Sequence, residues 1–177
     1  MDAFPAKSSR ASLSLPGLLA ALWGIAGVAL LLAHALWRLW PLAVAPLQSG
    51  ELTVGQALLY AAWVLFTAYA EGYRGFQLRF APSCAARALN LAQSPTLLAS
   101  LLAPAYCMGL FAAPRRRLVT SWLLIIGITG LVMLVKLLEQ PWRGIVDGGV
   151  VVGLSWGLIA MVTSALATFR SALAPSR

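Results

Sequence analysis

Charged residues are scarce in this chain: they make up 10 % of its 177 residues, against roughly 25 % in a typical soluble domain. A soluble fold with so few charges lacks the polar groups to cover its own surface. Apolar residues make up 60 % of the sequence, and the mean hydropathy is +0.84. These values exclude an ordinary soluble domain and predict an integral membrane protein, since lipid tails solvate an apolar exterior.

Histidine and cysteine are nearly absent. His34 is the single histidine, which excludes two-histidine haem ligation within one chain and leaves single axial ligation as the alternative to a hydrogen-bonded interfacial histidine. Cys84 and Cys107 form no Cys-x-x-Cys motif. No Ser-Lys, Asp-Asp or His-Glu-x-x-His arrangement is present either. We therefore expect no cofactor, no metal site and no catalytic residue.

The net charge of +8 arises from 13 Lys and Arg against 5 Asp and Glu. The basic residues stand at the ends of apolar runs, and no basic patch is interleaved with aromatic residues. This distribution excludes a nucleic-acid partner. It predicts instead that the basic residues lie at the cytoplasmic membrane surface, near anionic lipid head groups.

Long apolar runs predict an all-α transmembrane bundle, because about 20 residues are needed for one helix to cross a bilayer. Residues 1–14 are expected to form a cytoplasmic tail, and residues 15–177 a single bundle. The polar stretch 71–95 predicts a cytoplasmic loop, in which residues 82–93 form a short surface helix with Arg87 toward water. The expected spans are residues 15–37, 52–70, 118–138 and 145–169.

The run 96–113 is ambiguous, because Pro104 lies near its middle. A crossing here gives five transmembrane helices and leaves the basic residues almost equally divided between the two sides. A re-entrant or interfacial segment that bends at Pro104 gives four, and places most basic residues inside. Short basic loops stay cytoplasmic. We therefore predict four spans with both termini cytoplasmic, and keep five spans as the alternative.

Gly149, Gly153 and Gly157 recur at every fourth residue of the last run. Small residues at this spacing share one helix face and let another helix backbone approach closely. The spacing predicts a helix-packing face. The packing partner is either the protein's own bundle or another subunit, including a second copy of the chain.

Four charged residues surround the hinge before the last run: Lys136, Glu139, Arg143 and Asp147. Glu139 and Arg143 are four residues apart and pair if the segment is helical. Asp147 opens the last helix, where a negative charge is favourable. The group predicts an interfacial salt-bridge network; an ion or substrate site is the alternative.

The triplet Arg115, Arg116 and Arg117 stands directly before the run 118–138. It predicts contact with anionic lipid, because arginine binds phosphate well. Glu71, at the end of the run 52–70, is interpreted as an anchor that pairs with Arg74 or with the triplet. The span centres then contain only neutral groups, which argues against ion-coupled transport.

The segments 71–76 (EGYRGF) and 142–149 (WRGIVDGG) resemble parts of small, uncharacterised, polytopic bacterial inner-membrane proteins. The resemblance covers the chain from the second expected span onward. It implies a multi-pass protein of the bacterial inner (cytoplasmic) membrane and carries over no activity or functional residue.

Three function classes fit these features. We expect a non-catalytic integral membrane subunit, an accessory or assembly component of a larger membrane complex, with membrane lipids and other subunits or a second copy as partners. One alternative is a small transporter or channel with its entrance at the hinge cluster. The other is a lipid-acting enzyme at the cytoplasmic face that uses Glu71 and the arginine triplet.

Overall fold

The computed structural model describes residues 13–50 and 52–174, and every regular element in that part of the chain is a helix. Most of the predicted tail 1–14, together with Glu51, lies outside the described residues. Three helices are long and apolar enough to cross a membrane. They are α1 (Leu15–Ser49), α6 (Arg115–Val135) and α7 (Trp142–Leu173). The predicted all-helical class is therefore confirmed.

The first helix, α1, begins where the sequence indicates and ends much later. The Ser14 hydroxyl caps it by accepting from the Gly17 amide at 3.2 Å. The predicted end at Trp37 is wrong, since the helix continues through two prolines to Ser49 and stops at Gly50, whose φ of 68° is left-handed. A single arginine, Arg38, interrupts the apolar run without breaking the helix. The hydropathy of a segment indicates whether it contacts lipid or water, and not whether its backbone is helical.

The next helix is continuous over forty residues, in three parts: α2 (Val54–Thr67), the π-helical segment η1 (Ala68–Phe80) and α3 (Ala81–Gln93). We refer to them together as the 54–93 helix. Its start is fixed by a capping box in which Thr53 and Gln56 each accept from the other's backbone amide. The helix predicted over 82–93 within the loop 71–95 is confirmed as α3, but the prediction that a loop precedes it is wrong, because η1 joins α2 to α3 without a break. Polar residues end an apolar run there, but they do not end the helix.

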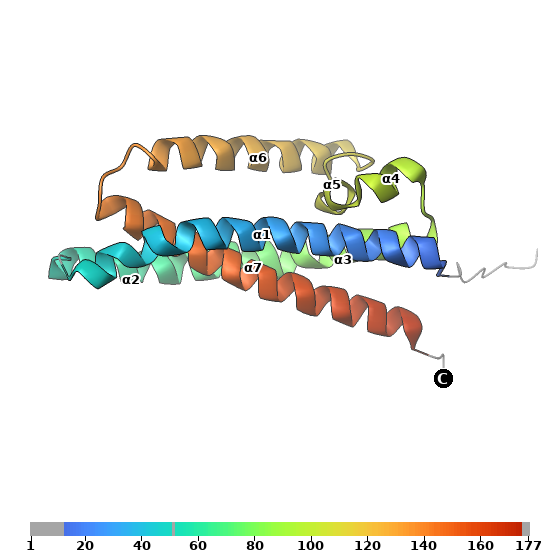
Figure 1. Ribbon diagram of the computed structural model, residues 1–177, viewed down its shortest axis with the longest axis horizontal. Coiled ribbons are helices and arrows are strands. Elements are labelled where there is room, and N and C mark those ends of the chain that lie inside the picture. Colours follow the sequence, from blue (N-terminus) through green and yellow to red (C-terminus); the bar gives the residue numbers. More distant parts are fainter. Residues whose placement is uncertain (1–12, 51, 175–177) are drawn as a thin grey trace, which may run out of the picture.

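The segment after this helix folds into two short helices, α4 (Leu97–Leu101) and α5 (Ala103–Met108), with Pro104 in the first turn of α5. Each has five or six residues, far fewer than the ~20 needed for a crossing. They lie at the end of the molecule where α1 begins and α7 finishes (Figure 1).

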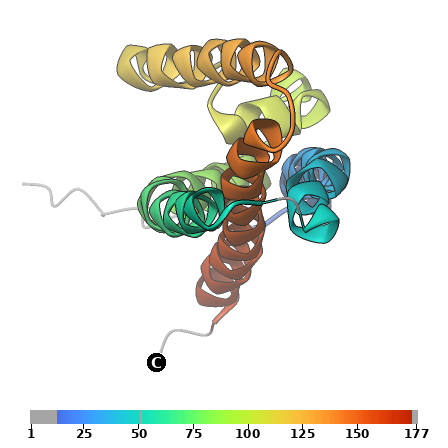
Figure 2. The ribbon, with the colours of Figure 1, turned by 90° about the vertical axis from the view of Figure 1, so that its left-hand side faces the viewer.

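The long helices alternate in direction along the molecule (Figure 1). α7 lies between α1 and the α2–η1 part of the 54–93 helix (Figure 2), while α3 packs directly on α1. α6 runs along the bundle but stands apart from it in both views. We call the end with α4 and α5 the basic end, because Arg87, Arg117 and Arg170 lie there, and the opposite end, with the 136–141 connection, the hinge end.

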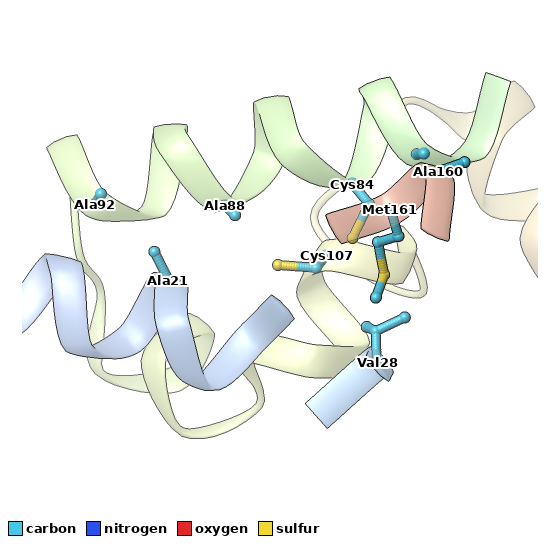
Figure 3. Packing of buried hydrophobic residues seen from close by; sticks show 9 residues of the cluster. Ala21, Val28, Cys84, Ala88, Ala92, Cys107, Ala160 and Met161 are labelled. Carbon is cyan, nitrogen blue, oxygen red and sulfur yellow. The ribbon is translucent and has the colours of Figure 1, made fainter. Parts of the chain in front are cut away.

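The core is built from small side chains of four helices (Figure 3). Ala85 and Ala92 are buried in α3, and Cys84 and Cys107 are buried with free thiols. At Gly17 a Cβ atom would collide with the Ala92 carbonyl. Small residues thus bring α1 and α3 into backbone contact, which is how helices associate where no hydrophobic force drives them together.

Candidate functional site

The three predicted packing glycines of α7 all face the 54–93 helix. A Cβ atom at Gly153 would lie 3.0 Å from Glu71 Oε2, and one at Gly157 would lie 2.6 Å from the Phe76 ring. One at Gly149 would overlap the Trp63 indole. The glycine face is therefore occupied within the chain itself.

Two aromatic side chains of α2 donate hydrogen bonds to two other long helices, α7 and α1. The Trp63 indole N–H donates to the Val146 carbonyl at 3.3 Å, and the Tyr60 hydroxyl donates to the Ala43 carbonyl at 3.1 Å. Each bond joins two different long helices. The hinge ends of α1, α2 and α7 are thereby held together, and neither of these two bonds involves α6.

The hinge cluster forms only in part. Arg143 Nε lies 3.7 Å from Asp147 Oδ2, and the side chains are 29 % and 6 % exposed. These two atoms are buried and make no hydrogen bond within the described chain. Lys136 and Glu139 are exposed, and the described residues offer neither of them an ion pair. The structure therefore brings together Arg143 and Asp147 and leaves the other two apart.

Gln140, a neutral residue of the hinge that no sequence pattern marks, makes two hydrogen bonds there. Its side-chain oxygen accepts from the Gly144 amide at 3.2 Å, and its amide nitrogen reaches the Leu42 carbonyl at 3.5 Å. It caps the start of α7 and ties it to α1.

Glu71 lies near the middle of the 54–93 helix rather than at the end of a span. Its side chain covers Gly153 of α7, and neither Arg74 nor the arginine triplet pairs with it in the described part of the chain. The surrounding segment is π-helical over thirteen residues. π-Helix usually occurs as single turns, often at functional sites. Glu71 is therefore the one carboxylate placed midway along the bundle among the described residues.

Arg87 holds in place the segment 96–113, which we call the broken segment because it is divided into α4 and α5. Its Nε donates to the Tyr106 carbonyl at 2.5 Å, and Nη2 donates to the Phe111 carbonyl at 2.9 Å. Both terminal nitrogens also reach the Ala112 carbonyl at 3.3 Å, and the guanidinium lies 4.0 Å above the Tyr106 ring. Gly109 and Ala112 have positive φ, so the chain turns there and leaves these carbonyls without helical partners.

The prediction that Arg87 faces water is therefore wrong. The sequence analysis missed its role because its partners lie 19 to 25 residues away in the chain. Two features of the sequence could have indicated this role. A segment interrupted by proline leaves backbone carbonyls without helical partners, and the neighbouring helix carries a single arginine among alanines.

The three arginines of the triplet do not share one environment. Arg115 and Arg116 are exposed, whereas Arg117 packs over Gly109, where a Cβ atom would lie 3.1 Å from its Nε. Arg117 and Arg87 line one pocket of about 420 Å³ between α3, α6 and α7. The other polar side chains that line it are Ser83, Asn90, Gln93 and Thr168.

α6 is attached to the rest of the molecule only near its ends. At the basic end the Ser121 hydroxyl and the Trp122 indole donate to carbonyls of the α5 turn, each at 3.2 Å. A Cβ atom at Gly127 or Gly130 would meet no atom within 4 Å. None of its most apolar 18-residue stretch is buried, against 33 % in α1 and in α7. A full-length apolar helix is thus left without a neighbour along its centre.

Comparisons with protein-family models, with curated proteins and with solved structures found no match for this chain. The resemblance to bacterial inner-membrane proteins therefore stays a prediction.

Proposed function

We propose that this protein is a non-catalytic integral membrane subunit, an accessory or assembly component of a larger complex in the bacterial inner membrane. The observation that carries the proposal is the isolation of α6. The other long helices use their small residues to pack on one another, whereas no residue in the most apolar 18-residue stretch of α6 is buried against the described part of the chain. We infer that a transmembrane helix of another subunit packs there.

The proposed topology has four crossings, made by α1, the 54–93 helix, α6 and α7, with both termini in the cytoplasm. Its support is the alternating direction of these helices (Figure 1) and the gathering of Arg87, Arg117 and Arg170 at the basic end. Positive charge in short loops stays cytoplasmic. The segment 96–113 then returns to the cytoplasmic side, with its carbonyls held by Arg87.

A partner helix suits α6 better than lipid alone for a physical reason. Helices associate in lipid through close van der Waals packing at small residues. Gly127 and Gly130 lower helix propensity, each by about 1 kcal/mol relative to alanine, and a Cβ atom at either position would meet no atom of the described residues within 4 Å. Contact with another subunit gives these two glycines the packing that the isolated chain does not.

Leucine at Gly127 or Gly130 is expected to disrupt the complex without harming the chain. Either change fills open space in the isolated protein and raises helix propensity by up to about 1 kcal/mol. We expect the wild-type protein, purified in mild detergent, to retain another subunit in fixed ratio by native mass spectrometry. We expect each variant to lose about tenfold in affinity for that subunit.

The matched control is Gly55→Leu, since a Cβ atom at Gly55 of α2 also meets no atom within 4 Å. This variant should keep the wild-type composition. A wild-type protein that purifies alone, or three variants with identical composition, would rule out α6 as the subunit interface.

A small transporter or channel is the second candidate function, and Glu71 favours it. Glu71 covers Gly153, which lies about 16 Å along α7 from Trp142 at a rise of about 1.5 Å per residue. A hydrocarbon core is about 30 Å thick. With the hinge at one interface, the carboxylate falls near mid-membrane, where ionisable groups often mark transport paths. The sequence-based interpretation that the span centres contain only neutral groups placed Glu71 at the end of a span. It does not apply to the four-crossing topology proposed here, in which Glu71 lies within a crossing helix.

A further inference from the structure

The pocket at the basic end has the character of an anion site. It lies between α3, the start of α6 and the last turns of α7, and its volume is about 420 Å³, within the usual range for ligand pockets. Two guanidinium groups, those of Arg87 and Arg117, line it. Arginine presents a rigid set of N–H donors that matches phosphate oxygens.

The described residues supply no counterion for these two arginines. Residues 72–138 contain no Asp or Glu, and neither arginine forms an ion pair within the described residues. Arg115 and Arg116 add further positive charge just outside the pocket. Two guanidinium charges that share one pocket repel each other unless an anion from outside lies between them.

Uncharged donors complete the lining. The side chains of Ser83, Asn90, Gln93 and Thr168 all line the pocket and make no hydrogen bond to another described residue. Most N–H groups of Arg87 already donate to carbonyls of the broken segment. Arg87 therefore contributes mainly positive charge to the pocket. Arg117 and the four neutral side chains are left to donate directly.

We propose that this pocket binds the phosphate of an anionic phospholipid head group. Leu124 and Ile128, seven and eleven residues after Arg117 and therefore on the same face of α6, are apolar and each 57 % exposed. A phosphate held by Arg117 would leave its acyl chains along that surface. Basic pockets between transmembrane helices on the cytoplasmic side are known to take anionic head groups. The proposal holds whether or not α6 also contacts another subunit.

The test compares Arg117→Gln with Arg116→Gln, which removes the same charge one residue away, outside the pocket. Each protein, in a neutral detergent, is titrated with short-chain phosphatidylglycerol, with short-chain phosphatidylcholine and with inorganic phosphate, and bound ligand is counted by native mass spectrometry. We expect the wild type to bind phosphatidylglycerol about tenfold more tightly than phosphatidylcholine. Arg117→Gln should lose about that factor, and Arg116→Gln about twofold at most.

Two further variants keep the outcome decisive. Arg117→Lys keeps the charge and should retain part of the affinity if Arg117→Gln fails to fold, and Asn90→Leu should weaken binding with no change of charge. Equal losses from Arg116→Gln and Arg117→Gln would reduce the effect to surface charge and overturn the proposal. Inorganic phosphate that binds as tightly as the lipid would assign the pocket to free phosphate and overturn the lipid assignment.

Discussion

Arg87→Met is expected to release the α5 segment and to lower the free energy of unfolding by about 2–4 kcal/mol. The Ala112 carbonyl is exposed, so water replaces the arginine there. The Tyr106 and Phe111 carbonyls are partly buried, and each such group costs about 1–3 kcal/mol when it is left unpaired. Methionine preserves most of the aliphatic packing over the Tyr106 ring, so the loss reports the hydrogen bonds.

The native thiol of Cys107 provides the measurement. It lies in α5 at 1 % exposure, so we expect it to react only when the segment opens. A loss of 2–4 kcal/mol in local stability corresponds to about 30- to 1000-fold faster maleimide labelling through local opening. Cys84 is replaced by alanine in every protein compared, so that Cys107 is the single thiol.

Arg79→Met is the control, because it removes an exposed arginine from the same 54–93 helix. It should leave both the labelling rate and the melting temperature in detergent unchanged. Labelling of Arg87→Met at the wild-type rate would mean that the broken segment is held by its own packing, and that the bonds from Arg87 contribute little.

Arg143→Met is expected to destabilise the bundle by about 3–5 kcal/mol, since it leaves the Asp147 carboxylate buried and unpaired. The reverse change, Asp147→Leu, should cost less, because Arg143 is 29 % exposed and its long side chain reaches toward the interface. The double variant should recover most of the loss, as replacing a buried ion pair by apolar side chains is often neutral. Thermal unfolding in detergent measures all three.

Glu139→Gln is the control for this pair. Glu139 belongs to the same predicted cluster but is exposed and forms no ion pair within the described chain, so its replacement should change the stability little. Additive losses in the double variant, in place of recovery, would contradict the pairing of Arg143 with Asp147.

The parts of the fold that depend on composition and local pattern could be predicted from the sequence. The low charge and the long apolar runs gave the all-helical class, and the runs 118–138 and 145–169 correspond closely to α6 and α7. What failed was the assumption that a helix ends where an apolar run ends. Arg38 closes one such run, and the residues after Glu71 close another, but the helices continue through both.

The candidate site was less predictable, because it depends on contacts between distant residues. Periodicity identified the face that contains Gly149, Gly153 and Gly157, but only the packed structure gives its neighbour. Sequence spacing favoured Glu139 as the partner of Arg143, whereas the fold buries Asp147 one turn further along. The hydrogen bonds from Arg87 depend on a chain reversal at Gly109 and Ala112, and local spacing does not indicate which distant side chain bonds the carbonyls freed there.

The proposed four-crossing topology requires the basic end to face the cytoplasm. Single cysteines at Gln48, Glu139, Arg116 or Ser171, in a chain whose two native cysteines are replaced by alanine, report this directly with a membrane-impermeant maleimide. These four residues are exposed, two at the hinge end and two at the basic end. Thiols at 48 and 139 should label in intact cells, and thiols at 116 and 171 only after the membrane is opened. Labelling at position 116 in intact cells would contradict the four-crossing topology.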